Sequence, residues 1–220
     1  MTEPSGESPE KRRRPVAVPA AALVAFTAFG VTALLGGLNE APEEPEPLGQ
    51  GAVLDQGLYS TRLVESRVTV ERAATRFDED KHFVELVFDV TNKGDETRSV
   101  GIPAQKLEQA YLSDSFAGSL LKINPSFGEK AVPFTFVRTK GGDSQQLHPG
   151  VTSQVIVRYR LEGDRRPPEK ISFEMASFEL TTGFNNELPR WQMVATEAGD
   201  SYLPEVKARV TLPVKKGGAA

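Results

Sequence analysis

Residues 81–96 carry a regular apolar alternation that ends in a turn, and this pattern constrains the fold of the chain. Val84, Leu86, Phe88 and Val90 alternate with a set that includes Glu85. A period of two predicts a strand with one face in the core and the other partly exposed to water. The strand leads into the sequence Asn-Lys-Gly-Asp, in which Asn and Gly tolerate the positive φ of a tight reversal. We therefore expect a core strand here.

The remainder of residues 52–214 repeats this organisation with short runs of β-branched and aromatic residues between turn signals. Such spacing is typical of an all-β sandwich or barrel. Residues 104–122 are the least strand-like part, and their apolar spacing predicts a short helix or an inserted flap. The clearest further strands are expected at 58–70, 98–102, 134–138, 151–161, 171–175 and 205–212.

The N-terminal segment predicts a membrane anchor. Residues 1–14 are polar, read as a disordered tail and end in the basic block Lys11-Arg12-Arg13-Arg14. Residues 15–38 follow, and a charge-free run of about 23 residues is long enough to cross a ~30 Å hydrocarbon layer as a helix. Positive charge before the run and glutamates after it predict a single-pass protein with a cytoplasmic N-terminus and an extracytoplasmic C-terminal domain.

Two alternatives to a simple anchor remain open. A cleaved signal peptide would use Val31-Thr32-Ala33 as its small-residue cleavage site, although the apolar run is longer than usual for such a peptide. The stripe of Ala17, Ala21 and Ala25 would allow the helix to pair with another one.

Residues 39–51 contain alternating Pro and Glu and predict an extended stalk between anchor and domain. Proline and like charges both favour polyproline II, which extends about 3.1 Å per residue. An acidic docking motif is the alternative interpretation. Residues 215–220 are expected to form a second disordered tail.

Composition excludes several kinds of site. The 220 residues include no Cys and two His, so a disulfide framework, a thiol nucleophile and a Cys-based zinc site are excluded, and a His-rich metal site nearly so. The net charge of -4 argues against nucleic-acid binding, which requires a basic surface.

The candidate chemical groups all have a structural interpretation. His82 opens the main strand and His148 lies in a Pro-Gly turn, and neither is expected to be catalytic. The triplet 78–80 (Asp-Glu-Asp) offers oxygen ligands for Ca²⁺, but a solvated acidic loop is favoured. Trp191 with Phe184 and Met193 is interpreted as a core cluster or as a ligand platform. The basic pairs Arg158 with Arg160 and Lys207 with Arg209 are interpreted as cross-strand ion-pair partners or as a binding surface for an anionic polymer.

A family resemblance rests on two turn motifs. The string FVELVFDVTNKGDE at 83–96, followed by Leu147-His148-Pro149-Gly150 and an alternating strand, resembles the telokin-like, immunoglobulin-like extracytoplasmic domains of Gram-positive bacteria, most closely the single-anchor actinobacterial type. That family ends one strand with V-T-N-x-G-D and opens a later one with L-x-P-G. The resemblance covers most of 53–213, departs from the family at 104–133, and implies an immunoglobulin-like antiparallel β-sandwich without established catalytic residues.

From these observations we expect a non-catalytic binding or scaffolding module of the cell envelope, anchored in the membrane and contacting another envelope protein or a wall component. No catalytic, cofactor-binding or metal-binding residue is predicted. The alternative is a small envelope hydrolase or a ligand sensor with a cleft near residues 104–133.

Overall fold

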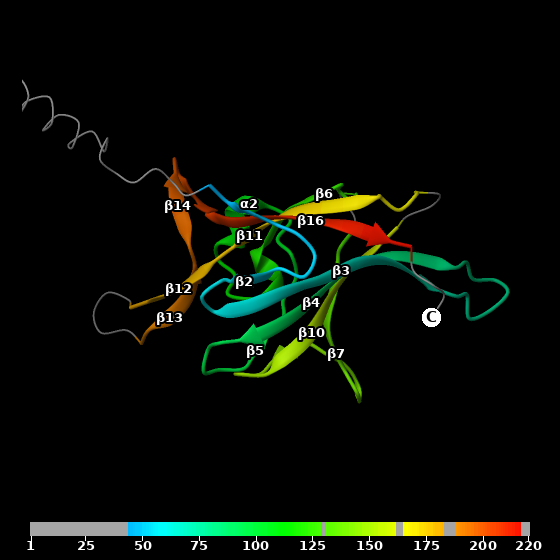
Figure 1. Ribbon diagram of the computed structural model, residues 1–220, viewed down its shortest axis with the longest axis horizontal. Coiled ribbons are helices and arrows are strands. Elements are labelled where there is room, and N and C mark those ends of the chain that lie inside the picture. Colours follow the sequence, from blue (N-terminus) through cyan, green and yellow to red (C-terminus); the bar gives the residue numbers. More distant parts are fainter. Residues whose placement is uncertain (1–43, 129–130, 162–164, 183–187, 217–220) are drawn as a thin grey trace, which may run out of the picture. The chain divides into compact units, whose positions relative to one another are not determined.

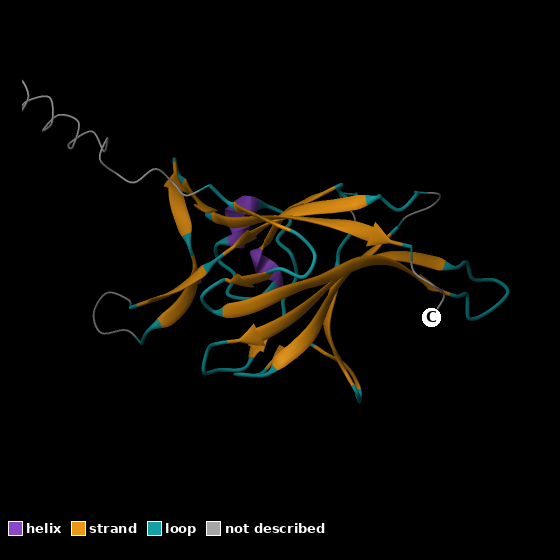
Figure 2. Ribbon diagram, in the orientation of Figure 1, coloured by secondary structure: helices purple, strands orange, loops and turns teal. Residues whose placement is uncertain are grey.

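The structure is a computed structural model that describes residues 44–128, 131–161, 165–182 and 188–216. Residues 44–220 form a compact unit by themselves. The described part of this unit consists mostly of strands, arranged in two layers that face each other (Figures 1 and 2). The predicted all-β sandwich is therefore confirmed.

The first layer is built around the last strand of the chain. Its order is β6-β11-β16, and β1 pairs in parallel with β16. The bounds are β1 Glu46–Leu48, β6 Leu120–Asn124, β11 Lys170–Ala176 and β16 Val206–Lys215.

The second layer contains the strand on which the sequence argument is based. Its order is β3-β4-β10-β7-β8, and β2 pairs with β3. The bounds are β2 Val53–Asp55, β3 Tyr59–Glu71, β4 Lys81–Asn92, β7 Phe134–Thr139, β8 Gly142–Ser144 and β10 Thr152–Arg160.

The two layers are joined along one side only among the described strands. Val214 and Lys215 of β16 pair in parallel with Ser66 and Arg67 of β3, so the hydrogen-bonded sheet folds over at this point. This parallel pair, like the one between β1 and β16, departs from the purely antiparallel sandwich that we predicted. The two ends of the strand order, β6 in the first layer and β7-β8 in the second, are edges that do not pair with each other.

Short elements cover the ends of the sandwich. They are the pairs β5 Arg98–Ser99 with β9 Gln146–Leu147, β12 Phe178–Thr181 with β13 Arg190–Met193, and β14 Ala195–Ala198 with β15 Ser201–Pro204, together with helix α2 Leu107–Ala110 and the 3-10 turn η1 Ala117–Ser119. The predicted short helix within 104–122 is confirmed by α2.

The core lies between the layers and includes the predicted inner face of β4. Val84, Leu86, Phe88 and Val90 are all fully buried. The Phe88 ring meets that of Phe173 from β11 edge-on, with centroids 5.9 Å apart, and this contact joins the two layers.

The opposite face of β4 is partly exposed at Phe83, Asp89 and Thr91, as predicted, but it is buried at Glu85 and Val87. Glu85 is fully buried there, and so are Val87 and its neighbours Phe136 and Ile156 from β7 and β10. The reason is that the strands on either side of β4 carry large side chains at matching positions. Arg158 lies opposite Glu85 in the register and stacks over Phe136 at 5.2 Å. A small second cluster therefore buries this carboxylate.

The boundary of the domain also differs from the predicted one. Residues 46–48, which we assigned to the stalk, form strand β1 and pair with Ala208, Arg209 and Val210. Leu48 packs against the core, so this part of the stalk segment belongs to the sandwich. Strand β16 runs to Lys215, one residue into the predicted tail.

The remaining terminal predictions lie outside the described residues. These are the cytoplasmic tail 1–14, the transmembrane helix 15–38, the start of the stalk at 39–43 and residues 217–220. Where the structure describes the chain, none of its helices has the length and apolar character needed to cross a bilayer. The membrane anchor stays a prediction.

Candidate functional site

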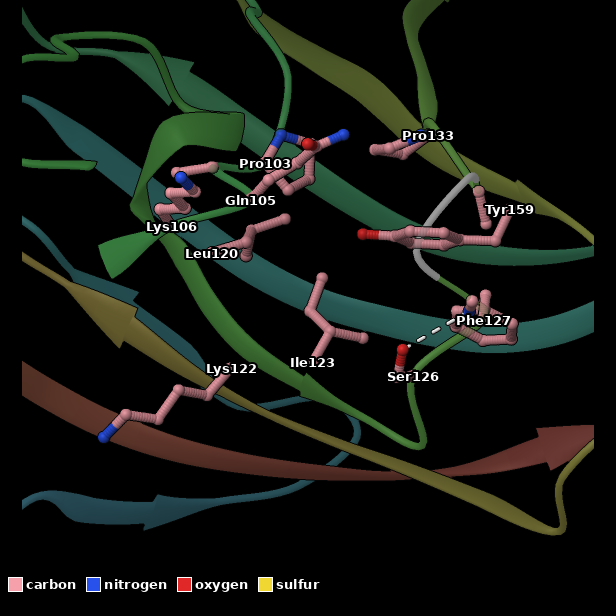
Figure 3. A pocket seen from close by; sticks show the side chains of 13 residues that line it. Pro103, Gln105, Lys106, Leu120, Lys122, Ile123, Ser126, Phe127, Pro133 and Tyr159 are labelled. Carbon is pink, nitrogen blue, oxygen red and sulfur yellow. Dashed lines mark hydrogen bonds between the residues drawn. The ribbon is translucent and has the colours of Figure 1, made fainter. Parts of the chain in front are cut away.

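A pocket of about 500 Å³ lies where the two layers are not joined. It is bounded by β6 of the first layer, by Tyr159 near the end of β10 in the second, and by the irregular segments that connect them (Figure 3). Its lining residues are Pro103, Ala104, Gln105, Lys106, Leu120, Lys122, Ile123, Ser126, Phe127, Gly128, Ala131, Pro133 and Tyr159. We call this site the Tyr159 pocket. Its position coincides with the cleft that the alternative prediction placed near residues 104–133.

Apolar side chains form about half of the pocket wall. Leu120 and Ile123 project from β6, and Phe127 follows in the loop after that strand. Phe127 stacks on the Tyr159 ring, with centroids 4.5 Å apart and an interplanar angle of 19°. Pro103 and Pro133 complete the apolar lining from the two connecting segments. A wall of this composition favours the apolar part of a ligand.

The hydroxyl of Tyr159 is the polar group at the centre of the pocket. The residue as a whole is 6% exposed, and its hydroxyl forms no hydrogen bond with the described residues, although the oxygen is not among the fully buried atoms that lack a partner. Figure 3 shows the oxygen directed away from Phe127, toward the end of the pocket where Gln105 and Leu120 lie. Burial raises the pKa of the Tyr159 phenol, which therefore stays protonated and able to donate a hydrogen bond.

Two lysines line the pocket, but they differ in what they contact. The Nζ of Lys122 lies 2.9 Å from the Glu174 carboxylate, and its side chain points out of the pocket. Its backbone has a φ of 47°, an uncommon conformation for a residue with a side chain, in the strand pair where β6 and β11 shift register. Lys106 precedes α2 at the same end of the pocket as Gln105 and forms no ion pair with the described residues.

The charge around the pocket is positive where the structure describes it. None of the described lining residues is acidic, and residues 129–130, between Gly128 and Ala131, lie outside the described part. A smaller cavity of about 260 Å³ shares Ser126 and Phe127 with the Tyr159 pocket and is lined by Arg165 and Arg166. Arg165 donates to the Ser126 carbonyl at 3.3 Å.

The two histidines lie away from this pocket. His82 is exposed at the start of β4. His148 is exposed in the turn before β10, where Nδ1 lies 3.0 Å from the Thr97 hydroxyl. Both positions are those expected from the sequence.

The acidic triplet at 78–80 takes part in the structure of its own loop. Asp78 accepts a hydrogen bond from the Thr75 hydroxyl, and Asp80 accepts one from the backbone of Ala73, each at 2.8 Å. Among the described residues no group of three or more acidic or histidine side chains is arranged to hold a metal ion.

The predicted Trp191 cluster is partly core and partly cavity lining. Met193 is 4% exposed and belongs to the core, against which Trp191 packs while partly exposed. Both residues also line a separate cavity of about 430 Å³ with Arg98 and Tyr111. Phe184, the third member, lies outside the described residues.

The predicted ion pairs of the basic strand residues are confirmed for Arg158 and Arg209. Arg158 bonds to Glu85 in the second layer, with Nη2 to Oε1 at 2.6 Å, and Arg209 contacts Glu174 in the first layer at 3.4 Å. Arg160 is exposed on β10, and Lys207 lies on β16. Because the two pairs lie on different layers, they do not form one basic patch.

The two turn motifs that carry the family resemblance meet in space. The buried side chain of Asn92 donates to the carbonyls of Glu96, at 2.7 Å, and Leu147, at 3.0 Å. The backbone of Gly150 donates to the Asn92 carbonyl at 2.8 Å. These motifs therefore join the end of β4 to the start of β10, which is a structural task.

Comparisons with known proteins add little to this geometry. No protein-family model matches the chain, and no curated protein matches it. A solved structure that is similar is an uncharacterised β-sandwich protein from Clostridium difficile 630, with 11% identity and a TM-score of 0.38; the match covers 63% of this chain and 93% of that chain. So distant a likeness carries no argument about function, and the resemblance to the telokin-like family stays a prediction.

Proposed function

We propose that the chain is a membrane-anchored, extracytoplasmic protein. Its immunoglobulin-like sandwich serves as a non-catalytic binding module of the cell envelope, and its ligand site is the Tyr159 pocket. The anchor and its orientation are supported by the basic block at 11–14, the uncharged run at 16–38 and the acidic residues after it. The immunoglobulin-like assignment is supported by the turn motifs that meet at Asn92.

The observation that carries the binding role is the pocket itself, into which the Tyr159 hydroxyl points. Among the described residues no hydrogen bond engages this hydroxyl, so it can donate to a ligand that enters the pocket. A cavity of about 500 Å³ that combines apolar side chains with polar ones has the size of a small-molecule site.

A binding role agrees better with these side chains than a catalytic one. The phenol at the centre has a pKa raised by burial, so it serves as a donor at neutral pH and not as a base. The neighbouring Lys122 is engaged by Glu174. Both histidines of the chain are elsewhere, in exposed positions. These features support a ligand sensor over a hydrolase.

The test uses Nile red, a neutral dye whose fluorescence rises in apolar sites. The segment 44–216 is suitable, because all described core residues lie within it. We expect the dye to bind, and Ala131→Trp to abolish binding because the indole fills the pocket. The matched control is Val132→Trp, at the adjacent residue, which is 62% exposed and does not line the pocket. Equal dye binding by the parent and Ala131→Trp, with both folded by circular dichroism, would contradict the proposal.

A further inference from the structure

Three of the five polar side chains that line the described part of the Tyr159 pocket lie toward one end. Figure 3 shows the hydroxyl of Tyr159 pointing toward the side on which Gln105 and Lys106 lie, while Phe127 and Ile123 occupy the other part of the wall together with Ser126. The end toward which the hydroxyl points is therefore the more polar one.

All three side chains at the polar end can donate hydrogen bonds. The phenol of Tyr159, the amide of Gln105 and the ammonium of Lys106 supply donors, and Lys106 adds a positive charge. The pKa of Tyr159 is raised, so deprotonation does not remove its donor at neutral pH. Charge-assisted hydrogen bonds to an anion are roughly twice as strong as neutral ones.

We propose that the ligand of the Tyr159 pocket is a single-chain amphiphilic acid, with its apolar chain against Phe127 and Ile123 and its anionic head at the Tyr159 hydroxyl and Lys106. This inference rests on the proposed function, because it identifies the ligand class for the same pocket. The charge of the described lining complements such a head, because Lys106 is positive, Lys122 is paired with Glu174 outside the pocket, and none of the described lining residues is acidic. Arg165 and Arg166 in the adjoining cavity extend the positive surroundings.

Decanoate and decan-1-ol are suitable probes, since they share an apolar chain and differ in the charge of the head. Titration calorimetry on the segment 44–216 should show tighter binding of decanoate. Tyr159→Phe keeps the ring that stacks on Phe127 and removes only the donor. It should weaken decanoate binding about ten-fold or more, as expected for a lost hydrogen bond to a charged group.

The charge of Lys106 is tested separately. Lys106→Gln should weaken decanoate binding by a factor of about two to five, the range for an exposed charge, and should leave decan-1-ol unaffected. Lys106→Arg should retain the preference for the acid. The matched control is Lys140→Gln, which removes an exposed lysine at the β7–β8 turn, outside the pocket.

Two results would overturn the inference: decan-1-ol binding as tightly as decanoate, or unchanged decanoate affinity in the folded Tyr159→Phe variant. Either result, combined with Nile red binding that Ala131→Trp abolishes, leaves the pocket as a ligand site and rejects only the acidic head. If Nile red binds equally well to the parent and to the folded Ala131→Trp variant, the proposed function itself is rejected.

Discussion

Glu85 is held between two guanidinium groups on the face of β4 that lies away from the main core. Its Oε2 lies 2.9 Å from Arg67 Nη2, and its Oε1 lies 2.6 Å from Arg158 Nη2. Burial alone would raise the pKa of Glu85, but the hydrogen bonds from Arg158 and Arg67 outweigh this effect and hold the pKa below its ordinary value. The carboxylate is therefore charged and fully paired in the folded state.

Removal of this carboxylate should destabilise the protein. Glu85→Ala leaves two arginines next to an apolar cluster without their partner. Breaking a buried pair costs about 3–5 kcal/mol, and we expect about 2–3 kcal/mol because both guanidinium groups keep some access to water. Asp89→Ala is the control on the same face, since its partner Arg62 is largely exposed and such pairs contribute at most about 1 kcal/mol. Urea unfolding of both variants measures the difference, and equal losses would contradict the assignment.

The pairing of Glu85 with Arg67 and Arg158 also predicts a loss of stability in acid. Because the folded pKa of Glu85 is lowered, its contribution is complete above the unfolded pKa of about 4.3 and disappears as the pH falls through the folded value. The free energy of unfolding of the parent should therefore exceed that of Glu85→Gln most above about pH 5, and the two should converge only when the pH falls below the lowered folded pKa. Parallel pH profiles from urea titrations would show that Glu85 does not titrate as proposed.

Sequence alternation predicted the inner face of β4, but it did not predict the burial of Glu85 and Val87 on the outer face. The inner face needs only the period of two, which a single strand displays. The burial of Glu85 depends on Arg67 and Arg158, which are 18 and 73 residues away in the chain. Nothing within residues 81–96 indicates that these two strands lie on either side of β4.

At the scale of elements, β4 packs against both neighbouring strands and against the opposite layer. It pairs with β3 through Leu63 opposite Phe88 and with β10 through Val155 opposite Phe88. The Phe88 ring contacts Phe173 across the core and Phe116 near η1, with centroids 5.9 and 5.3 Å apart. One side chain thus joins both layers and the irregular segment.

Phe88→Ala should therefore cost about 3–5 kcal/mol of unfolding free energy, the range for deleting a buried phenylalanine. A loss of this size is a large part of the stability of an ordinary domain. Phe134→Ala is the matched control, because this phenylalanine of β7 is 53% exposed, and it should cost about 1 kcal/mol or less. Thermal and urea unfolding would test both. A similar loss at Phe134 would mean that the outer face is covered by more than the described chain.

Elements with strong periodicity were predicted, and those without it were missed. The strands around 134–138, 151–161, 171–175 and 205–212 follow their patterns. Strand β1 was missed because proline and glutamate indicate an extended stalk, whereas its parallel partner β16 lies some 160 residues later. The hairpins β12–β13 and β14–β15 are four residues per strand, too short for an alternation to be recognised.

For the whole molecule, the joint at β16–β3 determines where a pocket can form. The layers are closed on that side, so an unjoined edge remains between β6 and β7-β8, and residues 103–133 fill it incompletely. The sequence marked this segment as irregular and thus located half of the site. It did not single out Tyr159, because the place of this residue in the pocket depends on how a segment 26 to 56 residues away packs against it.

Insertion of the predicted anchor is testable at one residue near its centre. Phe29→Asp should disfavour insertion by about 2.5–3.5 kcal/mol relative to an apolar residue at this depth. We expect the variant to be released from membranes or degraded, as followed by fractionation and immunoblotting. Phe29→Leu is the control and should remain in the membrane fraction. Retention of Phe29→Asp would argue against a spanning helix at 15–38.

The orientation can be tested by labelling, because the chain contains no cysteine and any introduced thiol is unique. Lys140 is exposed at the β7–β8 turn, and Ser8 lies before the basic block. The positive-inside rule places Ser8 in the cytoplasm and Lys140 outside. In intact cells a membrane-impermeant maleimide should therefore label Lys140→Cys, while Ser8→Cys should react only after permeabilisation. The reverse pattern would overturn the proposed orientation. Labelling of Lys140→Cys on a shortened, released chain would instead favour the cleaved signal peptide.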